Sequence, residues 1–253
     1  SYMTINTKNM NNLYSAHEKI WQTVFDNQDS LAIANTLLCG GTALARFYLD
    51  HRVSYDLDFF VPGKFNPEAL LVKLSASGIV VKEPVIERRD QFCRQLSGVT
   101  KDLQEIVKID FIEDIYEGMF DSVITQGART EVIDGLYHRK VRTVSGMYLV
   151  DGSIKGGRQT ARDVFDLYAL SLSVEPLHQF VSRVNEQGAN IPVEGICKGI
   201  LSMPWIDLLD DFEELEMLGD WKSSDLSKVR RLLEKEVLLL QNQTPDSIHG
   251  TAV

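Results

Sequence analysis

A pair of glycines and two closely spaced aspartates, all in the first quarter of the chain, have the types and spacing to do chemistry. Gly40 and Gly41 precede a helical pattern, and glycines at the start of a helix leave backbone N–H groups open to a phosphate. Asp56 and Asp58 lie two residues apart in an apolar run that predicts a strand, on which alternate side chains share a face. Two neighbouring carboxylates repel each other, and a bound divalent cation removes that repulsion. The combination suggests metal-assisted phosphoryl or nucleotidyl transfer.

A third acid, Asp110, lies in a later strand-like run, where alternation places it on the same face as Lys108. If this strand lies beside the strand of Asp56 and Asp58, three carboxylates converge and can hold two metal ions about 3.5–4 Å apart. Mg²⁺ suits this oxygen-rich site because no soft ligand is nearby. One ion would lower the pKa of an attacking hydroxyl, and the other would hold a triphosphate. Asp110 is the best candidate for taking the proton.

Each of these features alone has a plain structural explanation. Asp-x-Asp occurs by chance on many solvated strand faces, and a Gly-Gly pair is commonly a turn. Lys108 and Asp110 by themselves suit a cross-strand charge pair. Their combination, in helix–strand order, is what favours a chemical site.

The composition is that of a soluble globular protein large enough for one large domain or two modest ones. Cys39, Cys93 and Cys197 are far apart and form no CxxC pair, so we expect neither a disulfide framework nor a zinc ribbon. We expect the protein to lie in a reducing cytoplasm. The polar first twelve residues and the absence of a long apolar run predict no signal peptide and no membrane span. A net charge of −10 argues against a general nucleic-acid coat protein but permits a local basic groove.

Hydrophobic periodicity divides the chain into an α/β domain over residues 1–125, a mostly helical domain over 126–243 and a flexible tail over 244–253. In the first domain we expect helices over 11–38 (in two segments, the second capped by Asp29-Ser30), 41–49 and 67–77, and strands over 55–61, 79–86, 92–99 and 105–112. In the second we expect helices over 136–144 and 162–172, from Pro176, Pro192 and Pro204 onward, and over 224–241, with a loop or hairpin over 152–157.

Three segments carry a resemblance to a known family. The string Gly40 to Leu44, followed by Arg52, Ser54, Asp56 and Asp58, resembles the polymerase-β-like nucleotidyltransferases, and more narrowly the AbiEii/AbiGii-type toxins of bacterial abortive-infection and toxin–antitoxin systems. Residues 136–140 resemble the family's lysine motif, and residues 162–168 resemble its Arg-Asp-x-x-Asp-Leu motif. The resemblance implies an α+β fold, in which a mixed sheet flanked by helices is followed by a mostly helical C-terminal region.

The resemblance also implies roles for individual residues. Asp56 and Asp58 would be metal ligands, joined by Asp110, and Lys140 would contact the triphosphate. Asp163 matches an acid that the family needs, either to position Lys140 or to act near the acceptor. Phosphate binding is implied for Gly40, Gly41 and Thr42, and support of that loop for Arg52 and Ser54. We expect Asp166 to be structural. Arg142 and Lys155 are alternatives to Lys140 as the cation that contacts the triphosphate.

The expected function is a Mg²⁺-dependent nucleotidyltransferase that moves a nucleoside monophosphate from a nucleoside triphosphate (NTP) to a nucleic acid, with the 3′ end of a tRNA as the leading acceptor. The resemblance implies that it acts as a toxin beside a cognate antitoxin, in the cytoplasm. One alternative is the same transfer to a small molecule or a protein hydroxyl. A second alternative is an inactive relative that serves as a binding module.

Two charged segments bear on the partners. From Arg129 to Arg162 there are seven Lys or Arg residues and three acids, an excess that could follow an RNA backbone or simply form a solvated face. From Asp207 to Asp220 there are seven acids and no base, which suits a solvated helix face or a docking patch for a basic partner.

Overall fold

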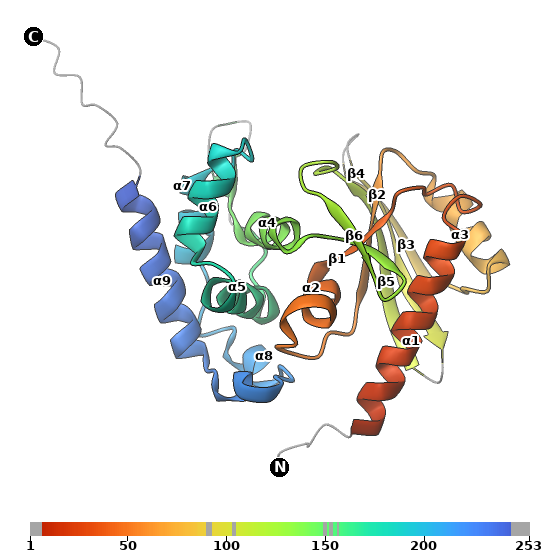
Figure 1. The fold of residues 1–253 in the computed structure, drawn as a ribbon, viewed down its shortest axis with the longest axis horizontal. Coiled ribbons are helices and arrows are strands. Elements are labelled where there is room, and N and C mark those ends of the chain that lie inside the picture. Colours follow the sequence, from red (N-terminus) through yellow and green to blue (C-terminus); the bar gives the residue numbers. More distant parts are fainter. Residues whose placement is uncertain are drawn as a thin grey trace, which may run out of the picture. The chain divides into compact units, whose positions relative to one another are not determined.

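A computed structural model of the chain describes residues 7–89, 93–102, 105–148, 151, 154–155 and 157–243. The fold divides into two compact units (Figure 1). The first comprises Ser1–Leu136 together with the short segment Glu216–Leu218, and the second comprises Tyr137–Leu215 and Gly219–Val253.

The first unit is built on a five-stranded mixed sheet with the order β1-β2-β5-β4-β3. Its strands are β1 (Leu37–Cys39), β2 (Leu57–Pro62), β3 (Lys82–Arg89), β4 (Cys93–Asp102) and β5 (Glu105–Asp114). The central pair, β2 and β5, is parallel, and every other neighbouring pair is antiparallel. The α+β fold class expected from the sequence is confirmed.

Alternation along the two central strands gives the sheet one apolar face. Phe59 of β2 and Phe111 of β5 are fully buried register partners whose rings stack 4.9 Å apart. Phe25 of helix α1 (Thr7–Asp26) lies 6.0 Å from Phe59, so α1 packs over this face. Asp58 and Asp110 occupy the alternate positions on the same strands and therefore lie on the opposite face.

The expected helix ending at residue 38 is wrong. Residues 27–36 form turns, in which Ala32 and Asn35 have left-handed backbone angles (φ of 57° and 60°). Residues 37–39 form edge strand β1, which pairs with β2. A run of three apolar residues does not distinguish a helix from a strand, and pairing with β2 decides the outcome.

The other elements expected in the first unit are confirmed within a few residues. The expected helix after the glycines is α2 (Gly40–Leu44), which continues as a π-helical turn over Ala45–Leu49. Helix α3 (Pro67–Ala76) begins where Asn66 caps it, with the side-chain oxygen accepting from the Ala69 N–H at 2.9 Å. A hairpin of β6 (Ser122–Thr125) and β7 (Ala128–Glu131) was not expected.

The second unit is helical apart from a hairpin of β8 (Met147–Tyr148) and β9 (Ile154–Lys155), which falls in the segment expected to be a loop or hairpin. Its helices are α4 (Ile133–Val144, which begins in the first unit), α5 (Ala161–Ser173), α6 (Leu177–Glu186), α7 (Val193–Leu201), α8 (Leu209–Glu213) and α9 (Leu226–Gln243), with a 3₁₀ turn over Gly219–Ser223. Helix α9 packs against α5, α6 and α7, and its buried stripe includes Val229, Leu233 and Val237.

The expected helix from Pro204 is reduced to turns followed by the short α8. The tail expected over 244–253 lies outside the described residues, as do Gly152, Ser153 and Gly156 of the expected loop. Among the helices that the structure describes, none combines the length and the apolar composition that a membrane span requires.

Candidate active site

The first glycine of the pair lies directly against an aspartate. Gly40 opens α2 with φ of +75°, a conformation that favours glycine, and a Cβ atom at this position would collide with the Asp58 carboxylate. The register of β1 and β2, which pairs Cys39 with Asp58, explains the closeness. The glycine therefore lets the backbone at the start of α2 approach the carboxylate.

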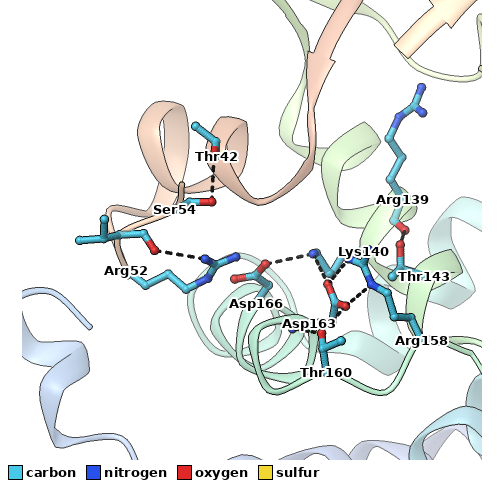
Figure 2. Close-up of polar contacts among 11 residues, drawn as sticks. Thr42, Arg52, Ser54, Arg139, Lys140, Thr143, Arg158, Thr160, Asp163 and Asp166 are labelled. Atoms are coloured by element: carbon cyan, nitrogen blue, oxygen red, sulfur yellow. Dashed lines mark hydrogen bonds and ion pairs between the residues drawn. The ribbon is translucent and has the colours of Figure 1, made fainter. Parts of the chain in front are cut away.

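The second glycine is packed by the segment that precedes β2. A Cβ atom on Gly41 would lie 2.5 Å from Arg52 Nη2 and 3.3 Å from Ser54 Oγ. The hydroxyls of Thr42 and Ser54 are hydrogen-bonded at 2.8 Å (Figure 2). Thr42 also donates to the backbone oxygen of Asp56. All of these side chains except Asp56 are buried. The structure thus brings the expected loop residues together.

The acids on the sheet form a pair. Asp58 and Asp110 are register partners on the parallel strands β2 and β5, which places their side chains on neighbouring strands of one face. Asp110 is buried, with Lys108 Nζ 3.5 Å from its Oδ2 atom and Gln95 Nε2 3.4 Å from its Oδ1 atom.

Asp56 does not share this arrangement. Strand β2 begins at Leu57, so the alternation argument that put Asp56 and Asp58 on one face does not reach Asp56. Within the described part of the chain, no three His, Cys, Asp or Glu side chains are grouped so that they could hold a metal ion, and the expected convergence of three carboxylates is not seen.

The pair nevertheless fits Mg²⁺. This ion is commonly held by one or two carboxylates, with substrate phosphates and waters completing its shell. Asp58 and Asp110 offer hard oxygen donors, and Gly40 keeps the space beside Asp58 free of a side chain. Two carboxylates next to the glycines that start α2 therefore suit one such ion together with a phosphate.

The second unit contains an ion cluster around Lys140 of α4 (Figure 2). Lys140 Nζ lies 2.7 Å from Asp163 Oδ1 and 3.0 Å from Asp166 Oδ2. Arg158 contacts Asp163 through Nε (2.5 Å to Oδ2) and Nη2 (2.8 Å to Oδ1). The side chains of Asp163 and Asp166 are fully buried and that of Lys140 is 7 % exposed. Lys140 is therefore not a solvated helix lysine.

The charges of this cluster compensate one another. Burial by itself raises the pKa of Asp163, but Lys140 and Arg158 outweigh burial and hold the pKa of this carboxyl well below its usual range. Thr160 also contributes, because its hydroxyl lies 2.5 Å from Asp163 Oδ2 and accepts from the Asp163 N–H at 3.3 Å. Of the two roles considered for Asp163, this geometry matches the positioning of Lys140.

Sequence reasoning missed Arg158 and Thr160 as partners of Asp163. A signal was present, since Thr160-x-x-Asp163 before a helix has the spacing of a capping box, and Thr160 is the N-cap of α5. Arg158 was counted only as part of the basic tract. The alternative cation Lys155 has a side chain outside the described residues.

The other cations in the tract from Arg129 to Arg162 differ in exposure. Arg129 donates to Ser122 Oγ at 3.4 Å in an exposed contact, and Arg142 donates to the Ala189 carbonyl at 2.7 Å. Arg139 is buried, whereas Arg162 is exposed and the Arg158 side chain is 51% exposed although it contacts Asp163. A solvated face and an RNA-binding surface both remain predictions for this tract.

Comparison with known proteins places the chain in a family. The model of the family described as "Nucleotidyl transferase AbiEii toxin, Type IV TA system" matches residues 24–186, which include the glycine loop, the acid pair and the Lys140 cluster. No curated protein gives a significant match.

Two solved structures from Helicobacter pylori have a similar fold. JHP933 is 21% identical, with a TM-score of 0.51 over 94% of this chain and 94% of that one. A second protein, provisionally assigned as a nucleotidyltransferase, is also 21% identical, with a TM-score of 0.53 over 95% of this chain and 97% of that one. At this identity the likeness supports the fold alone, whereas the family match covers more than half of the sequence. The chain belongs to the AbiEii nucleotidyl transferase toxin family of type IV toxin–antitoxin systems.

Proposed function

We propose that this protein uses Mg²⁺ to transfer a nucleoside monophosphate from an NTP to a hydroxyl of a nucleic acid, with the 3′ end of a tRNA as the acceptor to test first. The observation that carries the proposal is the approach of Gly40 to Asp58, which is itself in register with Asp110. This arrangement puts the start of α2 beside two carboxylates, and a metal-bound phosphate can use both features.

Each group has a proposed task. The backbone N–H groups at Gly40 and Gly41 bind phosphate oxygens, with Thr42, Arg52 and Ser54 holding the loop in shape. Asp58 and Asp110 hold Mg²⁺, with Asp56 as a further proposed ligand. When bound, Mg²⁺ lowers the pKa of the acceptor hydroxyl and offsets charge on the leaving pyrophosphate.

In the proposed reaction, one bond to phosphorus forms and one breaks. The acceptor oxygen forms a bond to the α-phosphorus, and the bond from that phosphorus to the oxygen bridging to the β-phosphate breaks. The hydroxyl proton passes to a carboxylate, for which Asp110 is the proposed acceptor, and pyrophosphate leaves.

The choice of a tRNA acceptor rests on family membership rather than on surface charge. Arg142 donates to a backbone carbonyl, and Arg129 and Arg158 are partly exposed, so the basic tract by itself does not decide for an RNA groove. Family membership also supports a cognate antitoxin as partner, and we propose that the toxin acts in the cytoplasm, where its acceptor would lie.

The test is incubation of the full chain with Mg²⁺, each α-³²P-labelled NTP in turn, and total tRNA. A labelled RNA band that withstands denaturing electrophoresis and is absent with Asp58→Ala supports the proposal. Glu117→Gln, which removes an exposed charge elsewhere in the first unit, should keep full activity and serves as the control.

Other outcomes separate the alternatives. Label in a protein band or in a small molecule would overturn the RNA acceptor while keeping nucleotidyl transfer. NTP binding without labelling of RNA, protein or small molecules would overturn transfer and favour a binding module.

A further inference from the structure

Three residues from late in the sequence pair with the segment that supports the glycine loop. Val53 N–H donates to the Glu216 carbonyl at 2.9 Å, and Leu218 N–H donates to the His51 carbonyl at 3.0 Å. Between these bonds, Arg52 and Met217 form an antiparallel bridge. Glu216–Leu218, called the clip below, groups with the first unit although the residues on both sides of it belong to the second.

A side-chain bond reinforces the clip. The Tyr55 hydroxyl donates to Glu216 Oε1 at 2.5 Å. On the other side of the same residue, His17 Nε2 of α1 lies 2.8 Å from the Tyr55 carbonyl oxygen. The segment from His51 to Asp56 has no regular secondary structure apart from the bridge, so these contacts are what orders its backbone.

The segment held in this way is the one that shapes the glycine loop. Arg52, the bridge partner of Met217, packs its guanidinium against Gly41. Ser54 is hydrogen-bonded to Thr42, and the next residue after Tyr55 is Asp56, whose carbonyl also accepts from Thr42. A shift of the segment would move these supports together.

We propose that the clip is a positioning element that holds residues 51–56 and, through Arg52 and Ser54, sets the affinity of the glycine loop for the NTP. The inference rests on the proposed function, since it assigns a task at the same site. It adds Glu216, Leu218 and Tyr55 as positioning residues, none of which touches the phosphates. The C-terminal half of the chain thereby contributes to the nucleotide site of the first unit through three residues.

A proline substitution tests the backbone pairing. Leu218→Pro removes the N–H that donates to His51. We expect Leu218→Pro to raise KM for Mg·NTP about tenfold, the effect of losing one ordinary hydrogen bond, with kcat nearly unchanged. The control is Glu214→Ala, an exposed position outside the clip, which should leave KM within about twofold of the wild type.

Hydrogen exchange gives a readout that does not depend on activity. The Val53 amide should be protected in the wild type and exchange faster in Leu218→Pro. Fast Val53 exchange in the wild type would show that the clip is not formed in solution. Faster exchange in Leu218→Pro without a change in KM would show that the clip does not position the loop. A wild type that transfers no nucleotide would instead overturn the proposed function, and Val53 exchange would still report on the clip.

A double-mutant cycle tests the side-chain bond. Tyr55→Phe and Glu216→Ala should each raise KM by a smaller factor than Leu218→Pro, and the double variant should be no worse than either single variant, because both remove the same bond. Glu216→Gln retains an acceptor oxygen and should stay close to the wild type. Additive effects of the two single substitutions would overturn this part of the inference.

Discussion

Two groups of carboxylates in this molecule differ in the cationic side chains that lie beside them. On the sheet of the first unit, Asp58 and Asp110 are like charges on neighbouring strands. In the second unit, Asp163 and Asp166 are buried against Lys140, and Asp163 also against Arg158. The two groups differ in the exposure of the lysine beside them, because the Lys108 side chain that contacts Asp110 is 51% exposed whereas Lys140 is buried with its acids.

This difference bears on the roles of the acids. Two like charges on neighbouring strands attract a divalent cation more strongly than either charge alone, which suits a binding site. In the second unit, the buried aspartates fix the position of Lys140. Substitution of Lys140 should therefore lower the stability of the second unit, apart from any contact that Lys140 makes with a triphosphate.

The largest effect is expected at the carboxylate pair. Asp58→Ala should lower nucleotide transfer by about a thousandfold or more, because it removes a ligand of the proposed metal. Its free energy of unfolding should fall by less than that of Lys140→Ala, because the Asp58 side chain is only partly buried. Radiolabel transfer and urea denaturation measure the two quantities. Full activity in the variant would reject the assignment of Asp58 to the site. Marked unfolding would contradict the proposed difference between this acid pair and the buried cluster of the second unit.

Lys140→Ala should instead have its main effect on the free energy of unfolding. Loss of the lysine leaves Asp166 without its ammonium contact and Asp163 with Arg158 only, and breaking a buried ion pair from one side costs about 3–5 kcal/mol of stability. The double variant Lys140→Met with Asp166→Asn should regain much of the lost stability, because it removes the charge of Asp166 as well and Asp163 keeps its contact with Arg158. Lys198→Ala, on the exposed face of α7, is the control and should stay within about 0.5 kcal/mol of the wild type. Stability of Lys140→Ala equal to that control would contradict the cluster.

Two glycine substitutions sharpen the description of the loop. Gly40 and Gly63 both have positive φ (75° and 71°), but only a Cβ on Gly40 meets another group, the Asp58 carboxylate. The left-handed backbone alone should make alanine cost about 1 kcal/mol of stability at either position, and at Gly40 the collision with Asp58 should add to that cost. Only Gly40→Ala should also reduce transfer, by about tenfold or more, since Asp58 must move. Equal activity of Gly40→Ala and Gly63→Ala would contradict the assignment of Gly40 to the site.

The smallest effect is expected in the pH dependence of stability. Because the folded-state pKa of Asp163 is lower than its ordinary value of 3.8, its contribution is complete above that pH and is lost as the pH falls toward the folded-state pKa. The stability difference between the wild type and Asp163→Asn should therefore be large at pH 7 and smaller at pH 3. Chemical denaturation at the two pH values measures it, and a constant difference would show that the charge of Asp163 is not what matters.

Much of the fold was predictable because its signals are local. The proline and cap that start α3, the apolar stripe of α9 and the alternation of β5 are each contained within one segment. Strand β1 was mistaken for a helix because its three residues become a strand only by pairing with β2. The hairpin of β6 and β7 was missed for a similar reason, since its strands are only four residues each.

The candidate site divides in the same way. The glycine pair, Asp58 and the Thr42–Ser54 support lie close in sequence, and the structure brings them together. The spacing of Thr160 to Asp163 is a capping signal, whereas no local pattern indicates that Arg158 contacts Asp163. Glu216 carried none, because nothing near it in the sequence indicates that it pairs beside Arg52.

By itself, the sequence determined which residues could do chemistry here and which elements carry them, because side-chain type and local periodicity need no distant partner. The tertiary structure alone decided that Asp58 faces Asp110, that Lys140 is held by two aspartates and that a late segment holds the loop of an early one. These are contacts between distant segments. They form only when burial and hydrogen bonding over the whole unit outweigh the entropy of bringing those segments together.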